Sequence, residues 1–115
     1  MLPKNRRIPR RSFQQILSNN KRFNSPGLVL FISPIDPTNQ KNSRFSFSVS
    51  KKVKTRAVDR NKLRRRGYSV ISKHLKNIKP GYYLFFSFKK TTKADKFSVL
   101  EEEIKQLLSD SGMIS

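Results

Sequence analysis

The sequence predicts an α+β fold in one small domain, a sheet with helices packed against it. Three observations support this prediction. The chain has 115 residues, about the size of one domain, and no Gly/Ser-rich or Pro-rich linker divides it. Residues 44–50 alternate apolar and polar side chains, as a strand with one buried face does. Residues 55–76 instead repeat apolar side chains at helical steps, so we expect the order α-β-β-α-β-α within a single domain, residues 1–115.

The first half of the chain predicts a helix, a strand and a loop. Ser12 is placed to cap a short helix that ends near Asn20 and carries three apolar residues on one face: Phe13, Ile16 and Leu17. Residues 28–32 form a continuous apolar run between prolines, which predicts a strand buried on both faces or nearly so. Residues 34–43 are then expected to form a loop.

The middle of the chain predicts a strand followed by the longest helix. We expect residues 44–50 to pair with the preceding strand, because consecutive strands are usually neighbours. The helical period then covers residues 55–76, and its inward residues continue just beyond that range: Leu63, Gly67, Val70, Ile71, Leu75 and Ile78. Pro80 and Gly81 end this helix.

The last third predicts an aromatic strand and a final helix. Residues 82–88 contain five aromatic side chains in seven positions, which favours a strand. After a basic turn, Asp95 is placed to cap a helix with an apolar face: Phe97, Leu100, Ile104, Leu107 and Leu108.

The charge of the chain points to a polyanionic partner. The formal net charge is +19 and the pI is near 11.1, whereas most soluble domains are much closer to neutral. Residues 1–94 carry 24 basic and 2 acidic residues, and residues 95–115 carry 2 basic and 5 acidic ones. We therefore expect nucleic acid as the partner, with the C-terminal segment facing away from it. We also expect the basic residues 1–11 to be flexible without RNA.

The composition also excludes several kinds of site. Cysteine is absent, which rules out disulfides, thiolate metal sites and cysteine nucleophiles. No apolar run approaches the roughly 20 residues that cross a bilayer, and the N-terminus lacks the apolar stretch of a secretory signal. We expect a cytoplasmic protein that does not act at membranes.

The strongest local signal is the basic segment formed by residues 50–66. It holds nine of the 26 Lys and Arg residues, interrupted by apolar residues as in an ordered element. On a helical wheel Asn61 and Arg65 point away from the core, while three basic residues lie on the flanks: Lys62, Arg64 and Arg66. Arg60 falls at the helix start, where it can reach beyond the sheet to a ligand. Arg guanidinium groups bind phosphate oxygens in bidentate fashion, and Asn can hydrogen-bond sugar or base edges. This helix is therefore predicted to bind structured RNA.

Signals for catalysis by the chain itself are weak. His74 is the only histidine and falls on the inward side of the long helix, where we expect a packed imidazole. Asp36 and Asp59 are the only acidic residues before residue 95, too few for a two-metal nuclease site. Most aromatic residues are expected in the core, although a few beside basic groups could stack unpaired bases.

The basic segment resembles the signature of a known family, the bacterial ribonuclease P protein subunit. The matching residues are Ser50-Lys51-Lys52-Val53 and Ala57-Val58-Asp59-Arg60-Asn61-Lys62-Leu63-Arg64-Arg65, with the Arg-Asn step at their centre. The opening Leu2-Pro3-Lys4-Asn5-Arg6-Arg7-Ile8 to Phe13-Gln14 is also similar to that family's N-terminus. The predicted order of elements fits the family over nearly the whole chain, although Tyr68 stands where many members carry a further Arg.

The resemblance implies a ribonucleoprotein endonuclease that makes the mature 5′ end of tRNA. In this family RNA performs the hydrolysis with Mg²⁺, and the protein, which holds no metal site of its own and requires no protein partner, assists substrate capture. The catalytic RNA would be contacted by Lys51, Lys52, Arg60, Asn61, Lys62, Arg64 and Arg65. The first helix and the sheet would form a cleft for the single-stranded 5′ leader of precursor tRNA, lined by Phe13, Leu17 and Phe31. A left-handed βαβ crossover is also implied.

Two other functions fit parts of the sequence. A noncatalytic ribosomal or general RNA-binding protein of similar α+β fold fits the composition equally well, and only the pattern from Lys51 to Arg65 separates it from the family above. A stand-alone nuclease is suggested by basicity alone and is disfavoured by the missing acidic cluster.

Overall fold

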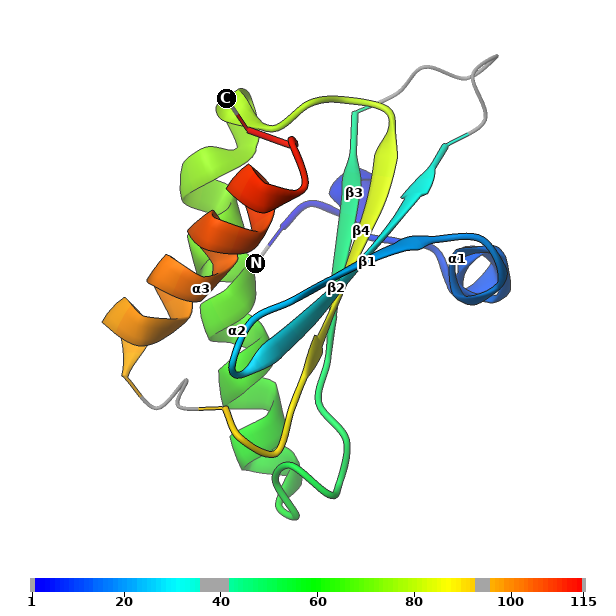
Figure 1. The fold of residues 1–115 in the computed structure, drawn as a ribbon. Helices are drawn as coiled ribbons and strands as arrows, with labels where there is room; N and C mark the ends of the chain where they lie inside the picture. The colour runs from blue at the N-terminus through cyan, green and yellow to red at the C-terminus, as the bar shows by residue number, and fades with distance from the viewer. Residues whose placement is uncertain (1, 36–41, 93–95, 115) are drawn as a thin grey trace.

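A mixed four-stranded sheet divides the protein into two layers of helices (Figure 1). The structure, a computed structural model, describes residues 2–35, 42–92 and 96–114. Its elements are the short 3-10 helices η1 (Lys4–Arg6) and η2 (Arg10–Ser12), α1 (Phe13–Ser18), β1 (Lys21–Asn24), β2 (Leu28–Pro34), β3 (Arg44–Ser48), α2 (Ala57–His74), the 3-10 helix η4 (Leu75–Asn77), β4 (Tyr82–Phe88) and α3 (Phe97–Asp110). The α+β fold predicted from the sequence is confirmed.

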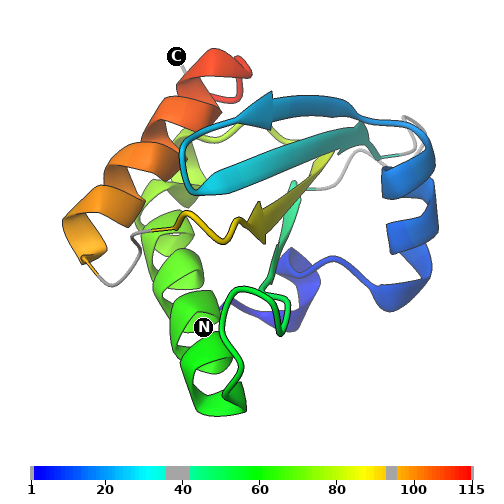
Figure 2. The ribbon, with the colours of Figure 1, turned by 60° about the horizontal axis from the view of Figure 1, so that its bottom comes forward.

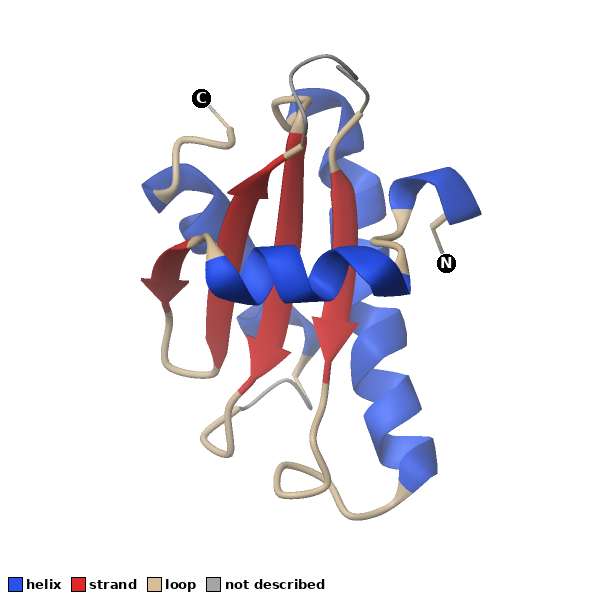
Figure 3. Cartoon of the chain, turned by 90° about the vertical axis from the view of Figure 1, so that its right-hand side faces the viewer, coloured by secondary structure: helices blue, strands red, loops and turns tan. Residues whose placement is uncertain are grey.

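The strands are arranged in the order β1-β2-β4-β3. Strand β4 pairs antiparallel with β2 and parallel with β3, and α2 connects β3 to β4. In Figure 3 both parallel strands run down the page, β4 lies to the left of β3, and α2 passes behind the sheet. This path is a left-handed crossover, the rare hand that the family resemblance implies.

One prediction about the sheet is wrong, and one strand was not predicted. Residues 44–50 do not pair with residues 28–32, because β4 inserts between β3 and β2. Strand β1 was missed, because only Phe23 is apolar in its four residues and the alternation is too short to detect. Lys21 and Arg22 suit this edge position, since charged side chains protect an edge strand from pairing with another chain.

The main core lies between the sheet and the pair α2 and α3 (Figure 2). The inward residues of β2, β3 and β4 meet the apolar faces of the two helices, and the largest fully buried members are Phe45, Phe86, Leu28, Leu30, Leu84, Ile71, Leu100, Ile104, Leu107 and Leu108. The predicted apolar face of α2 is confirmed at Leu63, Gly67, Val70 and Ile71. The predicted apolar face of α3 is buried at Leu100, Ile104, Leu107 and Leu108, while Phe97 is half-buried. Its proposed cap, Asp95, lies outside the described residues.

Gly67 allows α2 to approach the sheet closely. A Cβ atom at this position would lie 2.5 Å from Cε1 and 2.6 Å from Cδ1 of Phe47, which is itself buried and stacked on Phe86 with ring centroids 4.7 Å apart. We expect Gly67→Val to lower the free energy of unfolding by about 2 kcal/mol or more through overpacking. Urea denaturation of Gly67→Val and of Ser69→Val, an exposed position on the same helix, measures this effect. Equal stabilities would contradict the packing argument.

The other face of the sheet is covered only in part, by α1 and the N-terminal segment (Figure 3). Strand β2 buries Leu28, Leu30 and Ile32 on one face, while Val29 and Phe31 on its other face are half-buried, which agrees with the prediction of a strand buried on both faces or nearly so. Leu17, predicted to share a helix face with Phe13 and Ile16, is 60% exposed, whereas Ile16 is fully buried. Ser12 makes no side-chain cap; its hydroxyl donates to the hydroxyl of Tyr83 across 3.2 Å.

In the N-terminal segment, residues 2–12, the part from Lys4 to Ile8 lies along the outer edge of β3. The amide of Ile8 donates to the carbonyl of Phe45 (3.1 Å), and the Arg44 guanidinium donates to the carbonyl of Arg7 (3.4 Å). Leu2 and Ile8 are buried. The segment therefore extends the sheet surface with basic side chains, and its flexibility without RNA stays a prediction.

Candidate nucleic-acid interface

The start of α2 and the connection before it form a basic end of the molecule. Asn61 and Arg65 are exposed there, as the helical wheel predicts. Of the residues predicted on the flanks, Lys62 is exposed and Arg64 is half-buried, with its guanidinium donating to the Asn61 side chain. Lys51 and Lys52 are exposed in a turn closed by bonds from the amides of residues 53 and 54 to the Ser50 carbonyl. The residues predicted to contact the catalytic RNA thus gather at this end of α2, seen at the bottom of Figure 1.

Arg60 differs from its neighbours because its side chain forms hydrogen bonds to the protein backbone. Its Nη1 donates to the carbonyls of Lys54 (3.1 Å) and Thr55 (2.8 Å), in the connection from β3 to α2. The side chain is half-buried, so these charge-assisted bonds help to shape the connection. Sequence reasoning assigned Arg60 only to a ligand and missed this structural contribution.

We expect Arg60→Ala to lower the free energy of unfolding by about 1 kcal/mol, the lower end for charge-assisted hydrogen bonds because the group is partly exposed. Chemical denaturation measures the change. Lys62→Ala, which removes an exposed charge two residues away, is the control and should leave stability nearly unchanged. Equal effects of the two substitutions would show that the Arg60 bonds do not stabilise the connection.

A hollow beside α2 combines charge with an apolar wall. Its volume is about 550 Å³, and it is lined by Arg7, Val58, Asn61, Arg64, Arg65 and Tyr68. Val58 is 55% exposed, which is unusual for a residue of its type. Tyr68 is held firmly, because it is buried and packs edge-to-face on Phe47 at a centroid distance of 5.1 Å.

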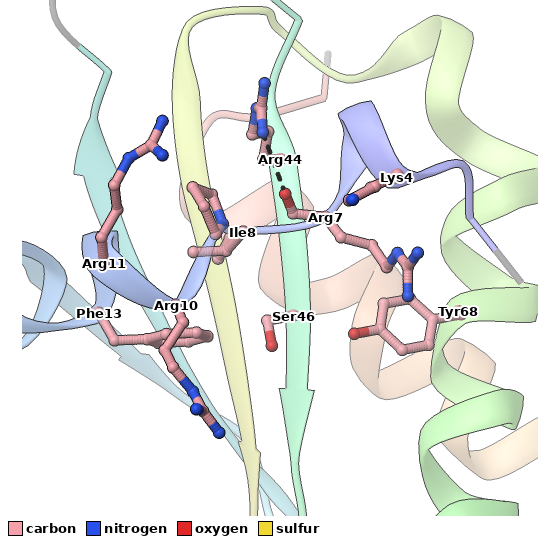
Figure 4. Close-up of a pocket in the computed structure, with 10 residues that line it drawn as sticks. Lys4, Arg7, Ile8, Arg10, Arg11, Phe13, Arg44, Ser46 and Tyr68 are labelled. Atoms are coloured by element: carbon pink, nitrogen blue, oxygen red, sulfur yellow. Dashed lines mark hydrogen bonds between the residues drawn. The ribbon is translucent and has the colours of Figure 1, made fainter.

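A second hollow runs from the N-terminal segment toward α1 (Figure 4). Its volume is about 610 Å³, and it is lined by Lys4, Arg7, Ile8, Pro9, Arg10, Arg11, Phe13, Arg44, Ser46 and Tyr68. Arg7 and Tyr68 border both hollows, so the two adjoin there. Every charged residue that lines them, within the described chain, is basic. The pair forms one electropositive path from α2 across the edge of β3 to the sheet surface, which we call the basic path.

Aromatic rings lie where the basic path reaches the sheet. Phe85 stands between the two predicted leader-binding phenylalanines: Phe13 meets it edge-on at 5.2 Å, and Phe31 stacks beside it at 5.7 Å between centroids. Strand pairing sets Arg22 beside Phe31, and its guanidinium lies 5.1 Å from that ring. All three rings are half-buried. Phe13, Phe31 and Phe85 form what we call the aromatic groove, and Leu17 is exposed on the same helix as Phe13.

Sequence reasoning missed several residues of this surface. Phe85 could have been found, because it alternates with the buried Leu84 and Phe86 and so belongs to the opposite face of β4. Arg44 could have been found in the same way, because it alternates with the buried Phe45 and so belongs to the opposite face of β3. Arg7 and Arg22 reach the surface only through the docking of the N-terminal segment and the pairing of β1, and neither was predicted.

Comparisons with known proteins give a consistent result. Residues 2–112 match the family model described as Ribonuclease P. The ribonuclease P protein component of Synechococcus sp. (strain JA-2-3B'a(2-13)) is 31% identical over 117 residues, covering 99% of this chain and 87% of that protein. That of Rippkaea orientalis (strain PCC 8801 / RF-1) is 33% identical over 116 residues, covering 98% and 91%.

Solved structures show the same fold. The Staphylococcus aureus RNase P protein superimposes with a TM-score of 0.83 at 18% identity, over 98% of this chain and 100% of that chain. The Thermotoga maritima RNase P protein gives a TM-score of 0.80 at 22% identity, over 90% and 96%. Among the described residues, no helix is both long and apolar enough to cross a membrane.

Proposed function

This chain belongs to the ribonuclease P protein family, and we propose that its surface is divided between two RNAs. Members of the family serve with RNase P RNA in an RNA-based endoribonuclease that processes the 5′ ends of tRNA. The basic end of α2 binds the RNase P RNA through Lys51, Lys52, Arg60, Asn61, Lys62, Arg64 and Arg65. The aromatic groove holds the single-stranded 5′ leader of precursor tRNA, with Phe13, Phe31 and the exposed Leu17 on its wall.

The observation that carries this proposal is the continuity of the basic path. The hollows at α2 and at α1 share Arg7 and Tyr68, so phosphates of one bound RNA and of a neighbouring strand can lie along one surface. Arg guanidinium groups bind phosphate oxygens in bidentate fashion. Unpaired bases of any identity can stack on partly exposed aromatic rings. An unpaired leader matches the groove better than a duplex does, because stacking needs bases that are not already stacked on both sides.

We assign the chemical step to the RNA. No three His, Asp or Glu side chains lie together in the described ranges in a way that would suit a metal ion. The donor set on this surface is Arg, Lys and Asn, which binds anions rather than divalent cations. In this proposal Mg²⁺ is bound and used by the RNA, and the protein's residues bind and orient the two RNAs. Action in the cytoplasm, away from membranes and without a further protein partner, is part of the same proposal.

A cleavage assay tests the proposed function. The protein with its cognate RNase P RNA should cut precursor tRNA at the 5′ end of the mature sequence at low Mg²⁺. The protein alone should not cut. Cleavage by the RNA-free protein would instead support the stand-alone nuclease, and equal binding of unrelated structured RNAs would favour a general RNA-binding protein.

A further inference from the structure

A third hollow lies on the other side of the sheet, where four segments distant in sequence meet. Its volume is about 550 Å³, within the range of small-molecule sites. It is lined by Asn19, Asn20, Lys21, Phe23, Ile32, Pro34, Lys79, Tyr82, Ser111, Gly112 and Met113, and we call it the C-terminal pocket. Phe23 and Tyr82 pack against the main core, so this pocket opens on the helix-covered face, opposite the aromatic groove.

The walls of the C-terminal pocket are fixed by hydrogen bonds. The buried Ser43 hydroxyl donates to the Lys79 carbonyl (2.5 Å) and accepts from the Tyr82 amide (3.1 Å). The Lys79 amide donates to the Met113 carbonyl (2.9 Å), which joins the turn before β4 to the segment that follows α3. The Asn20 side chain donates to the carbonyl of Ile16 (2.6 Å) and closes the end of α1. The pocket is therefore preformed, and a ligand would not need to order these segments.

The chemistry of the pocket is divided between its floor and its rim. The floor is apolar and partly aromatic, formed by Phe23, Ile32, Tyr82 and Met113. Lys21 and Lys79 stand exposed on the rim, neither ammonium group has a bonding partner in the described chain, and no acidic residue is among the lining residues. Asn19 adds an exposed amide, which can both donate and accept hydrogen bonds.

We propose that the C-terminal pocket binds one nucleotide. A base fills the apolar floor beside Phe23 and Tyr82, and its phosphate lies between the ammonium groups of Lys21 and Lys79. A planar ring that carries an anion is the ligand class that matches this floor and rim together. The nucleotide is either free or part of an RNA strand. This inference goes beyond the proposed function and does not depend on it, because the pocket shares no residue with the basic path or the aromatic groove.

The test is a titration of the ¹⁵N-labelled full chain with AMP, followed by amide NMR. We expect saturable shift changes at Lys21, Tyr82 and Gly112, and weaker binding of adenosine, which lacks the phosphate. Lys21→Glu with Lys79→Glu should weaken AMP binding about tenfold or more, since two charge-assisted contacts are lost. The control, Lys96→Glu with Lys105→Glu, changes the charge equally at exposed positions outside the pocket and should leave AMP binding unchanged.

A second arm identifies the source of the nucleotide. If it belongs to an RNA strand, the Lys21 and Lys79 variant binds RNase P RNA or precursor tRNA more weakly than the control variant does. If the nucleotide is free, the two variants bind RNA equally and only AMP binding is lost. Absence of saturable shifts at the pocket residues, or equal loss of AMP binding in the control, would overturn the proposal.

Discussion

Replacing Arg64 and Arg65 together by glutamate will weaken binding of the RNase P RNA by about 3 kcal/mol or more, which is over a hundredfold in Kd. Both side chains line the hollow beside α2, and Arg65 is exposed. Each loses a phosphate contact of about 1–3 kcal/mol, and the introduced carboxylates repel the same phosphates. The slope of log Kd against log salt should fall by about 2, one unit for each lost contact. Filter binding over a salt series measures both quantities.

The fold should survive this double substitution. Among the described residues, the Arg64 guanidinium bonds only the Asn61 side chain, on the solvent side of the helix, so little stability depends on it. Circular dichroism and urea denaturation check this point. Lys96→Glu with Lys105→Glu makes the same change in net charge just before and within α3, and separates a local contact from the effect of overall charge. Equal weakening by both variants would remove the start of α2 from the interface.

Local sequence patterns predicted the elements but could not predict how they are arranged. The helical repeat that includes Leu63, Gly67 and Val70 predicts α2, because a helix facing a core must bury one side. The alternation of Phe45 and Phe47 predicts β3 in the same way. Whether β3 pairs with β2 or β4 leaves these patterns unchanged, since either partner buries the same face. The pairing and the left-handed crossover are therefore set by packing over the whole domain.

The same distinction applies to the binding surface. The exposed side of α2 follows from one helix alone, so Asn61 and Arg65 were placed correctly. The aromatic groove depends on strand register and on the position of α1. Phe13 and Phe31 were known only from the family resemblance, while Phe85, which lies between them, was missed. The spacing placed Leu17 on one face of the first helix with Phe13 and Ile16, yet α1 is only six residues long, and Ile16 is its buried residue.

The contribution of the aromatic groove can be separated from that of the basic end of α2 by changing its rings. We expect Phe31→Leu with Phe85→Leu to weaken holoenzyme binding of precursor tRNA by about 1–3 kcal/mol, the usual cost of losing base stacking. Leucine keeps most of the apolar contact with β2, β4 and α1, so the sheet should remain folded. Binding of the RNase P RNA should not change, because neither ring lines the hollow beside α2. Equilibrium binding to precursor tRNA with a leader of several nucleotides measures the effect.

Mature tRNA without a leader is the internal control for this experiment. The variant and the unchanged protein should bind it equally, since the groove then has no strand to hold. Phe97→Leu is the matched protein control: Phe97 is also half-buried and also lies near a cation, with Lys73 4.9 Å from its ring, but it sits on α3 beyond the helix-covered face of the sheet. If the groove variant bound leader-containing and leaderless tRNA with the same change in affinity, its rings would serve packing alone. A loss confined to the leader-containing tRNA requires that Phe31 and Phe85 contact the leader, because the same holoenzyme provides every other contact in both measurements.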